Sequence, residues 1–452
     1  MAKQLLSVGV DVGTTSTQMI LSRLTAENKA SGFAVPKMEI TDREILYRSP
    51  VHFTPLAAHN LVDASALRHL IEKEYAAAGI TREQVDTGAV IITGETSRKE
   101  NARAVLEQLS DLAGDFVVAT AGPDLESILA ARGAGAVARS EGKRVLHMDI
   151  GGGTSNLCLI EDGKVLATGC LNVGGRLLKL DKNGVITYRS SVLEGITDLR
   201  EGVTPTPSQL ETLANTLTSA LEMAAGLIPE TDILCKLTTK ETGKAWNIPR
   251  DVIPSFSGGV ADCIAHDFPD NAFGDIGPIL GRAIRESKLC AGEYFLGEET
   301  IRATVIGAGC HSVQLSGSTV FSQNIRFPMK NIPAAVGENP KTPQNVQAML
   351  AGVDSDIAFL CIPGYASPTY GEIKRLAKVI AEGFGEKEIL VCVENDCAKA
   401  LGHCLRLLLP NRPCLCLDGL SLEPGSYLDV GESVGPAFAV VIKTFVLAGG
   451  NQ

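Results

Sequence analysis

The chain has 452 residues, of which 45% are hydrophobic and 21% charged, a composition typical of a globular protein with two or three domains. Its net charge of −11 argues against nucleic acid or an anionic membrane as the principal partner. No apolar run approaches the roughly 18 residues that a membrane-spanning helix needs, and the N-terminus reaches Asp11 too soon for a signal peptide. We therefore expect a cytoplasmic protein that does not cross a membrane.

The first predicted element is a β-hairpin over residues 5–22. An apolar run ends at Asp11, a turn rich in glycine and hydroxyl groups follows, and a second apolar run begins near Gln18. Such a turn offers backbone N–H groups and hydroxyls to an anion. The sequence of residues 11–21, DVGTTSTQMIL, therefore indicates a phosphate-binding loop.

Strands and helices then alternate, which indicates an α/β fold. We expect an extended segment at 49–56, an amphipathic helix at 64–79, a buried strand at 88–93, a helix at 99–114 and a strand at 115–122. A helix with small residues follows between Pro123 and Gly135. Small side chains there allow two helices or two domains to approach closely.

The second half opens with a copy of the first hairpin. Residues 149–159 read DIGGGTSNLCL, so that Asp149 repeats Asp11 and Asn156 repeats Gln18. Two such hairpins facing each other would hold a polyphosphate from both sides, and the two aspartates would face the metal ion that neutralises it. One Asp-x-Gly sequence is also common in ordinary turns, but the duplication favours a nucleotide site.

Residues 140–143 mark the predicted boundary between the two halves. Beyond the second hairpin, glycines again stand where strands are expected to end or turn. The predicted features are a two-residue hairpin turn at Asn183-Gly184, a helix opened by a capping box of Ser208 and Glu211, a strand within 251–263 that runs into Ser257-Gly258-Gly259, and a strand at 303–312 that ends at Gly307 and Gly309.

Residues 320–452 differ from the rest and are predicted to form a third, α+β domain. We expect a proline-spaced linker at 331–343, helices near 343–351 and 370–384, and β-rich closing segments. This part of the sequence holds no motif that indicates a chemistry.

The twelve cysteines are scattered, mostly in apolar strands, and none has a paired C-x-x-C spacing. Buried, reduced thiols are therefore a better interpretation than a metal site. His147, His311 and His403 lie in or beside predicted elements. Isolated histidines at such places are more often core or surface residues than metal ligands or acid–base catalysts.

Four glycine-containing segments, spread over two related halves, carry a resemblance to a known superfamily. They are residues 11–18, 149–156, 257–260 and 307–309. With them the chain resembles the superfamily of actin, sugar kinases and heat-shock chaperones, whose two α/β lobes close on ATP. The resemblance implies two duplicated ribonuclease H-like lobes of the actin-like ATPase type around a nucleotide cleft, at 1–140 and 141–319, and a C-terminal α+β domain at 320–452.

The same resemblance assigns residues to a site for ATP and Mg²⁺. Asp11 and Asp149 would hold Mg²⁺ through water, because this ion keeps much of its hydration shell. Gly258 and Gly259 would lie against the nucleoside, where a Cβ would clash, and Gly307 belongs to the second connecting segment. The residues that would contact phosphate are Gly13, Thr14, Thr15, Gly151, Gly152, Gly153 and Thr154.

One departure from the superfamily concerns hydrolysis. The chaperone-like branch usually carries a glutamate just before a proline, where it is thought to position the attacking water. Here Gly122 precedes Pro123, and Glu126 or Glu95 would have to substitute. We expect slow ATP hydrolysis that depends on positioning and metal electrostatics.

A closer resemblance covers residues 4–319. The segments CLNVGGRLL at 170–178 and RATVIGAG at 302–309, together with the two hairpins, resemble the ethanolamine ammonia-lyase reactivating factor (EutA) family. That family implies an ATP- and Mg²⁺-using chaperone that loosens inactivated ethanolamine ammonia-lyase, so that damaged cobalamin leaves and intact adenosylcobalamin enters. It also implies residence in or near a bacterial microcompartment.

Two other functions remain open at this stage. A small-molecule kinase of the same superfamily, acting on acetate or a sugar-like substrate, would need an aspartate base, and the candidates are Asp124, Asp262 and Asp275. The second open function is that of a nucleotide-dependent, actin-like scaffold. Arg176 is either a phosphate contact or part of an interlobe salt bridge. The oligomeric state is open.

Overall fold

The computed structural model describes residues 2–13, 16–29, 38–58, 61–93, 117–120, 123–239, 251–311, 313–317, 319–353, 355–422 and 425–444. Four predictions fall on other residues: the helix at 99–114, the phosphate contacts of Thr14 and Thr15, the role of Glu95 and the surroundings of Gly122. None of the helices in the described ranges combines the length and the apolar character that a membrane crossing requires.

The first lobe is built on a mixed sheet. Its strands are β1 (Lys3–Val12), β2 (Ser16–Asn28), β3 (Met38–Arg48), β4 (His52–Phe53), β7 (Thr87–Ile92) and β8 (Val117–Thr120). The order is β3-β2-β1-β7-β8, with β4 beside β2; β1 and β2 are antiparallel, and β1, β7 and β8 are parallel. The first hairpin and the strand predicted at 88–93 are confirmed.

One face of this sheet is covered by α1 (Ala64–Ala77), which confirms the helix predicted at 64–79. Alternate residues of β1 and apolar residues of α1 form the core between them, since side chains two apart on a strand share a face. The short strands β5 (Leu56–Ala58) and β6 (Leu61–Val62) precede α1 and pair with each other.

The second lobe repeats this plan. Its sheet has the order β11-β10-β9-β14-β15, with the strands β9 (Arg144–Ile150), β10 (Ser155–Glu161), β11 (Lys164–Leu171), β14 (Ile253–Ser257) and β15 (Phe295–Leu296). Again a hairpin, β9–β10, is antiparallel and the next strand, β14, lies parallel to its first member. The outer face carries the helices α4 (Pro207–Ala224), α5 (Asp232–Leu237), α6 (Gly259–Ala265) and α7 (Gly277–Arg285).

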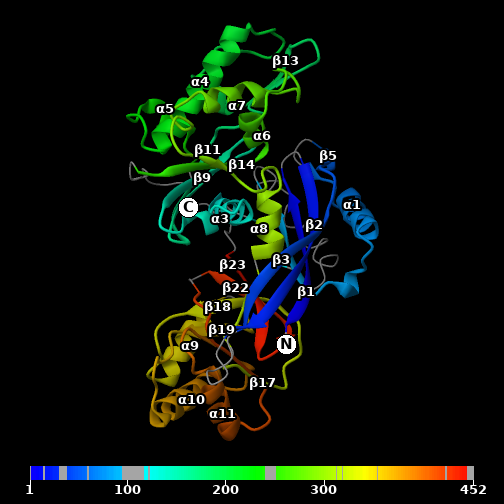
Figure 1. The fold of residues 1–452 in the computed structure, drawn as a ribbon. Coiled ribbons are helices and arrows are strands. Elements are labelled where there is room, and N and C mark those ends of the chain that lie inside the picture. Colours follow the sequence, from blue (N-terminus) through cyan, green and yellow to red (C-terminus); the bar gives the residue numbers. More distant parts are fainter. Residues whose placement is uncertain are drawn as a thin grey trace.

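Two helices exchange places between the lobes. Helix α3 (Pro123–Gly133) follows the first sheet in sequence but packs on β9–β11, whereas α8 (Ala303–His311) follows the second sheet and packs on β1, β2 and β7. The two helices also contact each other, and Figure 1 shows α8 between the lobes. The small residues predicted at 123–135 serve this approach, because a Cβ on Gly133 would lie 1.9 Å from the Ala303 carbonyl oxygen.

The strand predicted at 303–312 is therefore wrong. This apolar run is a helix, and its glycines do not end a strand. A Cβ on Gly307 would lie 2.0 Å from the carbonyl oxygen of Leu129, and one on Gly309 would lie 3.0 Å from the backbone nitrogen of Gly9. The glycines allow α8 to approach α3 on one side and β1 on the other.

Two local details of the second lobe also differ from prediction. The strands β12 (Leu178–Leu180) and β13 (Ile186–Arg189) form the expected hairpin, but five residues connect them, 181–185. Helix α4 is capped by Thr206 and Gln209 rather than by Ser208 and Glu211. Pro207 explains the shift, since proline fits the first helical position and the residue before it is extended.

The C-terminal part has an eight-stranded sheet of order β16-β23-β22-β18-β19-β20-β21-β17. Its strands are β16 (Val313–Leu315), β17 (Phe321–Gln323), β18 (Met329–Val336), β19 (Phe359–Ile362), β20 (Ile389–Val393), β21 (Cys414–Leu417), β22 (Ser426–Val434) and β23 (Ala437–Thr444). The predicted helices are present as α9 (Pro343–Ala351) and α10 (Tyr370–Phe384). The sequence did not indicate α11 (Ala398–Leu408), and the predicted linker at 331–343 is partly strand β18.

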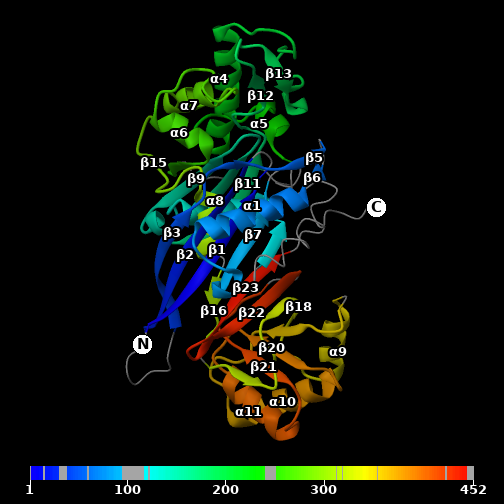
Figure 2. The same cartoon turned by 90° about the vertical axis from the view of Figure 1, so that its right-hand side faces the viewer.

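The three parts form an elongated molecule. The first lobe lies between the second lobe and the C-terminal part, as both views show (Figures 1 and 2). Apolar residues of β22 and β23 share a core with the first sheet and α8, among them Val434, Ala437 and Val441. The described part of the C-terminal sheet thus packs directly on the element that separates the lobes.

Candidate functional site

The two hairpin turns have the same backbone hydrogen bond. The N–H of Gly13 donates to the carbonyl of Ser16 at 2.9 Å, and the N–H of Gly151 donates to the carbonyl of Thr154 at 2.9 Å. Between the latter two residues, Gly153 faces open space, because a Cβ there would meet no atom within 4 Å. The duplication read from the sequence is therefore also a duplication of turn geometry.

Asp11 ends β1 beside the first turn. Its Oδ1 accepts a hydrogen bond from the Thr93 hydroxyl at 2.8 Å. Burial raises the pKa of Asp11 to about 7; the hydrogen bond from Thr93 lowers this pKa, and the nearby charge of Asp149 raises it. The two aspartates of the repeats are thus close enough to repel each other.

Asp149 ends β9 and is held from two elements. Its Oδ1 accepts from the Ser257 hydroxyl at 2.5 Å, and its Oδ2 accepts from the Thr304 hydroxyl of α8 at 3.4 Å. Burial raises the pKa of Asp149, and these hydrogen bonds lower it. Helix α8, which packs on the first lobe, therefore reaches the carboxylate of the second.

These two carboxylates suit a divalent cation. No positive side chain contributes to the pKa of either one among the residues that the structure describes. A buried carboxylate beside a half-buried one whose pKa it raises favours a bound cation, and carboxylate oxygens are ligands that Mg²⁺ accepts. No group of three or more potential ligand side chains occurs in the described ranges.

Gly258 and Gly259 have different roles. Gly258 has a φ of +83°, and a Cβ on it would lie 2.3 Å from the carbonyl oxygen of Ile150. Its lack of a side chain is thus required by the fold, apart from any ligand. A Cβ on Gly259 would meet nothing within 4 Å, so of the two glycines this one borders open space at the end of β14.

Two further predicted residues lie on the helices between the lobes. Gly307 is in the middle of α8, where it packs against Leu129. Glu126 is in the first turn of α3 and is half-buried.

Arg176 lies over the second turn. Its backbone N–H donates to the carbonyl of Gly152 at 2.6 Å, and its guanidinium pairs with Asp275 at 3.3 Å. This ion pair joins two parts of the second lobe. The other two candidate bases accept hydrogen bonds from threonines, Asp124 from Thr168 and Asp262 from Thr300.

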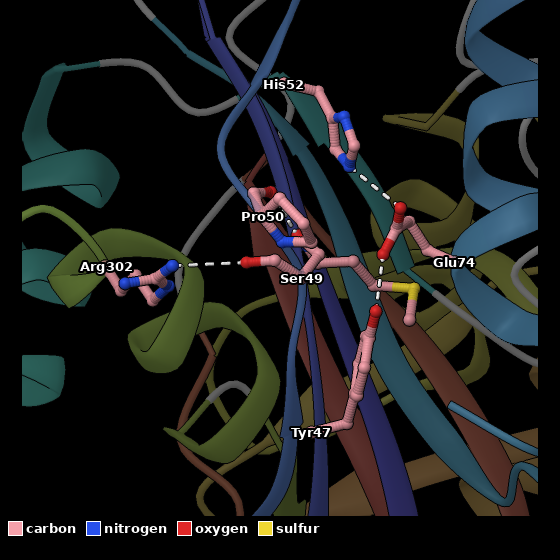
Figure 3. A network of polar contacts seen from close by, with 7 residues as sticks. Tyr47, Ser49, Pro50, His52, Glu74 and Arg302 are labelled. Carbon is pink, nitrogen blue, oxygen red and sulfur yellow. Dashed lines mark hydrogen bonds and ion pairs between the residues drawn. The ribbon is translucent and has the colours of Figure 1, made fainter. Parts of the chain in front are cut away.

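A polar network connects the first turn with the opposite lobe (Figure 3). Arg302, just before α8, donates to the carbonyl of Ser49 at 3.1 Å. Along the same segment, Thr54 donates to the carbonyl of Gly13 at 2.8 Å. The segment between β3 and β5 thus contacts the second lobe at one end and the phosphate turn at the other.

The middle of this segment is anchored on α1. The buried carboxylate of Glu74 accepts a hydrogen bond from the Tyr47 hydroxyl at 2.7 Å and lies 2.8 Å from Nε2 of His52 (Figure 3). The hydrogen bond to Glu74, with smaller effects of burial and charge, raises the pKa of Tyr47 to about 12.

Sequence reasoning missed several residues of the site. Thr93 and Thr304 carried no signal, because hydroxyl residues at the end of a strand or the start of a helix are common. Gln18 was visible as the repeat partner of Asn156; its amide N–H donates to the carbonyl of Ile301 at 3.2 Å. His147 is buried, as expected of an isolated histidine, but it is hydrogen-bonded toward Asp149 through Ser257.

Comparisons with known proteins agree with the motifs. The family model of the ethanolamine utilisation protein EutA matches residues 3–448. The ethanolamine ammonia-lyase reactivase EutA of Salmonella typhimurium is 38% identical over 473 aligned positions, which cover 98% of each chain. The reactivase of the same name from Escherichia coli is 38% identical over 460 positions, again with 98% of each chain.

Solved structures with similar folds cover about two thirds of the chain. A Ppx/GppA phosphatase of Aquifex aeolicus aligns with a TM-score of 0.43 and 12% identity over 68% of this chain and 99% of its own. The ethanolamine utilization protein EutJ of Carboxydothermus hydrogenoformans aligns with a TM-score of 0.32 and 17% identity over 67% of this chain and 88% of its own. The match to the EutA model over nearly the full length, with relatives at 38% identity, decides the assignment: the chain belongs to the EutA family of ethanolamine utilisation proteins.

Proposed function

We propose that this chain is an ATP- and Mg²⁺-dependent reactivating chaperone for ethanolamine ammonia-lyase. Its curated relatives are named ethanolamine ammonia-lyase reactivases and match it over 98% of its length. In the proposed reaction, the protein loosens a lyase that holds damaged cobalamin, so that intact adenosylcobalamin replaces it. The observation that carries the nucleotide part is the pair of aspartates, half-buried Asp11 and buried Asp149, beside the matching turns of two hairpins.

The site residues have separate roles in this proposal. Asp11 and Asp149 hold Mg²⁺, mainly through its water ligands, and the ion neutralises the phosphates. The turns that start at Gly13 and Gly151, with Thr14, Thr15, Gly152, Gly153 and Thr154, surround the phosphate chain. Gly259 borders the nucleoside, while Gly258 and Gly307 support this arrangement through the backbone contacts described above.

Helices α3 and α8 provide a route from nucleotide to lyase. They cross between the lobes, and the core that α8 shares with the first sheet includes residues of β22 and β23. A nucleotide that binds the closed lobes more tightly than the open ones shifts the protein toward closure by that difference in affinity. Movement of α8 would then change the surface that the lobes and the C-terminal part present to the lyase.

ATP turnover is proposed to be slow. Glu126 is the candidate for the water-positioning residue because it is in the first turn of α3, close in sequence to the position where the chaperone-like branch of the superfamily usually carries a glutamate. It is not adjacent to that position, and the metal and the turns then supply most of the catalysis. We further propose that the protein acts in the cytoplasm, in or near a bacterial microcompartment.

A small-molecule kinase is the second candidate, and the geometry favours it less. Each aspartate considered as a base is engaged: Asp124 and Asp262 accept from threonines, and Asp275 is paired with Arg176. Each of these contacts occupies a carboxylate oxygen with a donor from the protein. No described feature supports a filament-forming scaffold.

Recovery of a blocked lyase tests the proposal. Ethanolamine ammonia-lyase inactivated with cyanocobalamin is mixed with this protein, adenosylcobalamin, Mg²⁺ and ATP, beside a control without ATP. We expect deaminase activity to return only with ATP. No recovery, although the protein binds Mg-ATP, would overturn the chaperone proposal and move the kinase to first place.

A further inference from the structure

A chain of three buried polar side chains lies behind the carboxylate of Asp149. On the edge nearest the site, Asp149 accepts from Ser257; behind it, Nε2 of His147 lies 2.9 Å from Oγ of Ser257, and Nδ1 lies 3.0 Å from Oγ of Ser255. The side chains of His147, Ser255 and Ser257 have no solvent exposure. Neither the proposed metal site nor the phosphate turns use this histidine directly.

The fold places these residues in one row. His147 and Asp149 are two apart on β9 and therefore share a face, and Ser255 and Ser257 do the same on β14. The parallel register aligns Ser255 with His147 and Ser257 with Asp149. The chain is thus built from regular strand geometry, with each partner fixed by the sheet.

The donor and acceptor properties of these groups allow only one direction of proton donation along the row. An ionised carboxylate only accepts, so Ser257 donates its single proton to Asp149 and must accept from His147. The imidazole therefore carries its proton on Nε2, and its Nδ1 accepts from the hydroxyl of Ser255. One nitrogen of a neutral imidazole donates and the other accepts, so the neutral ring has only this one proton to give.

The first lobe has no equivalent. Gly9 stands two residues before Asp11, as His147 does before Asp149, and a Cβ at Gly9 would lie 2.5 Å from the carbonyl oxygen of Val305. Helix α8 occupies the space that the imidazole fills in the second lobe. Asp11 is therefore fixed by Thr93 alone, whereas a three-member chain stands behind Asp149.

We propose that His147 is a positioning residue for the metal-facing carboxylate of the second lobe, acting through Ser257. The chain keeps Oδ1 of Asp149 turned into the sheet, so that Oδ2 faces Thr304 and the space between the lobes. Partners of this kind orient a carboxylate before the ion arrives, and their loss commonly weakens metal affinity 10–100-fold. This inference rests on the magnesium site of the proposed function.

The test compares variants by the Mg²⁺ concentration that half-saturates the gain in nucleotide affinity, measured with a fluorescent ATP analogue. His147→Leu and Ser257→Ala should bind the analogue without Mg²⁺ like the wild type but require about 10-fold more Mg²⁺. His147→Gln, whose amide can donate to Ser257, should return the requirement close to the wild-type value. Ser22→Ala removes another buried serine hydroxyl, one that contacts Cys310, and should change nothing.

A second measurement does not depend on the metal. Nitrogen NMR of the histidine-labelled wild type, with the His147 signal assigned by its loss in His147→Gln, should show the proton on Nε2 without any nucleotide. A proton on Nδ1, or a wild-type Mg²⁺ requirement in both His147→Leu and Ser257→Ala, would overturn the proposal. If His147→Leu does not fold, Ser257→Ala and the NMR result decide. A wild type that shows no Mg²⁺-dependent nucleotide binding would instead refute the proposed function, and the NMR signal would still report on the chain.

Discussion

Asp11 and Asp149 have the same sequence context but different surroundings. Asp11 accepts one hydroxyl hydrogen bond from its own lobe, whereas Asp149 is bonded by Ser257 from its own sheet and by Thr304 from α8. Asp149 is buried and Asp11 is half-buried, and the charge of Asp149 raises the pKa of Asp11. Such an arrangement destabilises the fold and favours ion binding, as is common where a site is built for a ligand.

Asp11→Asn should therefore stabilise the protein in the absence of Mg²⁺ at neutral pH. The pKa of Asp11 is about 7 in the folded chain and near its ordinary value of 3.8 in the unfolded chain. Between these values the folded state binds more protons, so its free energy of unfolding falls as the pH rises. The asparagine amide does not titrate, so the variant does not lose this stability as the pH rises.

Thermal unfolding at pH ~8 without Mg²⁺ checks this prediction. We expect a higher melting temperature for Asp11→Asn, by roughly 2–4 °C for each kcal/mol, and a smaller rise when Mg²⁺ and ATP are added. At pH ~4, where the wild-type carboxyl is largely protonated in the fold, the difference should shrink. A variant that is less stable than the wild type at pH ~8 would contradict the electrostatic account.

Gly259→Val separates nucleotide binding from folding better than a change at Gly258. A valine at Gly258 would meet the Ile150 carbonyl at a φ of +83°, so it should destabilise the fold with or without nucleotide. Gly259 borders open space, and a side chain there should lower ATP affinity by about 10-fold or more while the melting temperature without nucleotide stays within about 2 °C. Unchanged ATP affinity would remove Gly259 from the proposed site.

The crossing of α3 and α8 is the element on which the two lobes depend. Gly307 and Gly133 allow backbone contact between α3 and α8, and the other side of α8 rests on Gly9 of β1. The small residues let the two helices pack as closely as side chains do in a protein core, so an added methyl group has no space. The crossing therefore fixes the distance between the lobes.

Gly307→Ala should destabilise the protein although alanine is the better helix former. The new Cβ would lie 2.0 Å from the Leu129 carbonyl oxygen, and overpacking of this kind costs about 1–3 kcal/mol. Gly371→Ala, in the exposed first turn of α10 where a Cβ meets nothing within 4 Å, is the matched control and should be neutral or slightly stabilising. Chemical denaturation of both variants measures the difference; equal stabilities would argue that α3 and α8 can separate freely.

Elements whose apolar residues recur with a clear helical or strand period were predictable from the sequence. Elements whose structure depends on tertiary contacts were not. The alternating hairpins and the stripe of α1 followed from periodicity. The run at 303–311 contains β-branched residues that favour a strand, yet it is a helix because its glycines fit between α3 and β1. Likewise, the exchange of α3 and α8 between sheets has no local signature.

At the scale of the whole molecule, the sequence repeat predicted only the part of the site that is present in both copies. The repeat indicated Asp11, Asp149 and the two turns without any structure. Thr93, Thr304, Ser255 and Ser257 come from strands and helices that the repeat does not include, and His147 lies on β9 just before the repeated residues. Their contribution depends on where the sheets bring them, which composition and spacing do not reveal.

In the proposed function, each lobe contributes one half of the nucleotide site. We therefore expect a single nucleotide to bind per chain. Calorimetric titration of Mg-ATP into the wild type, Asp11→Asn and Asp149→Asn tests this most directly. We expect one site per chain, with the Mg²⁺-dependent part of the affinity reduced about 10-fold or more in each variant. Two independent sites per chain, or a variant that binds Mg-ATP like the wild type, would contradict the claim that the two hairpins form one magnesium–nucleotide site.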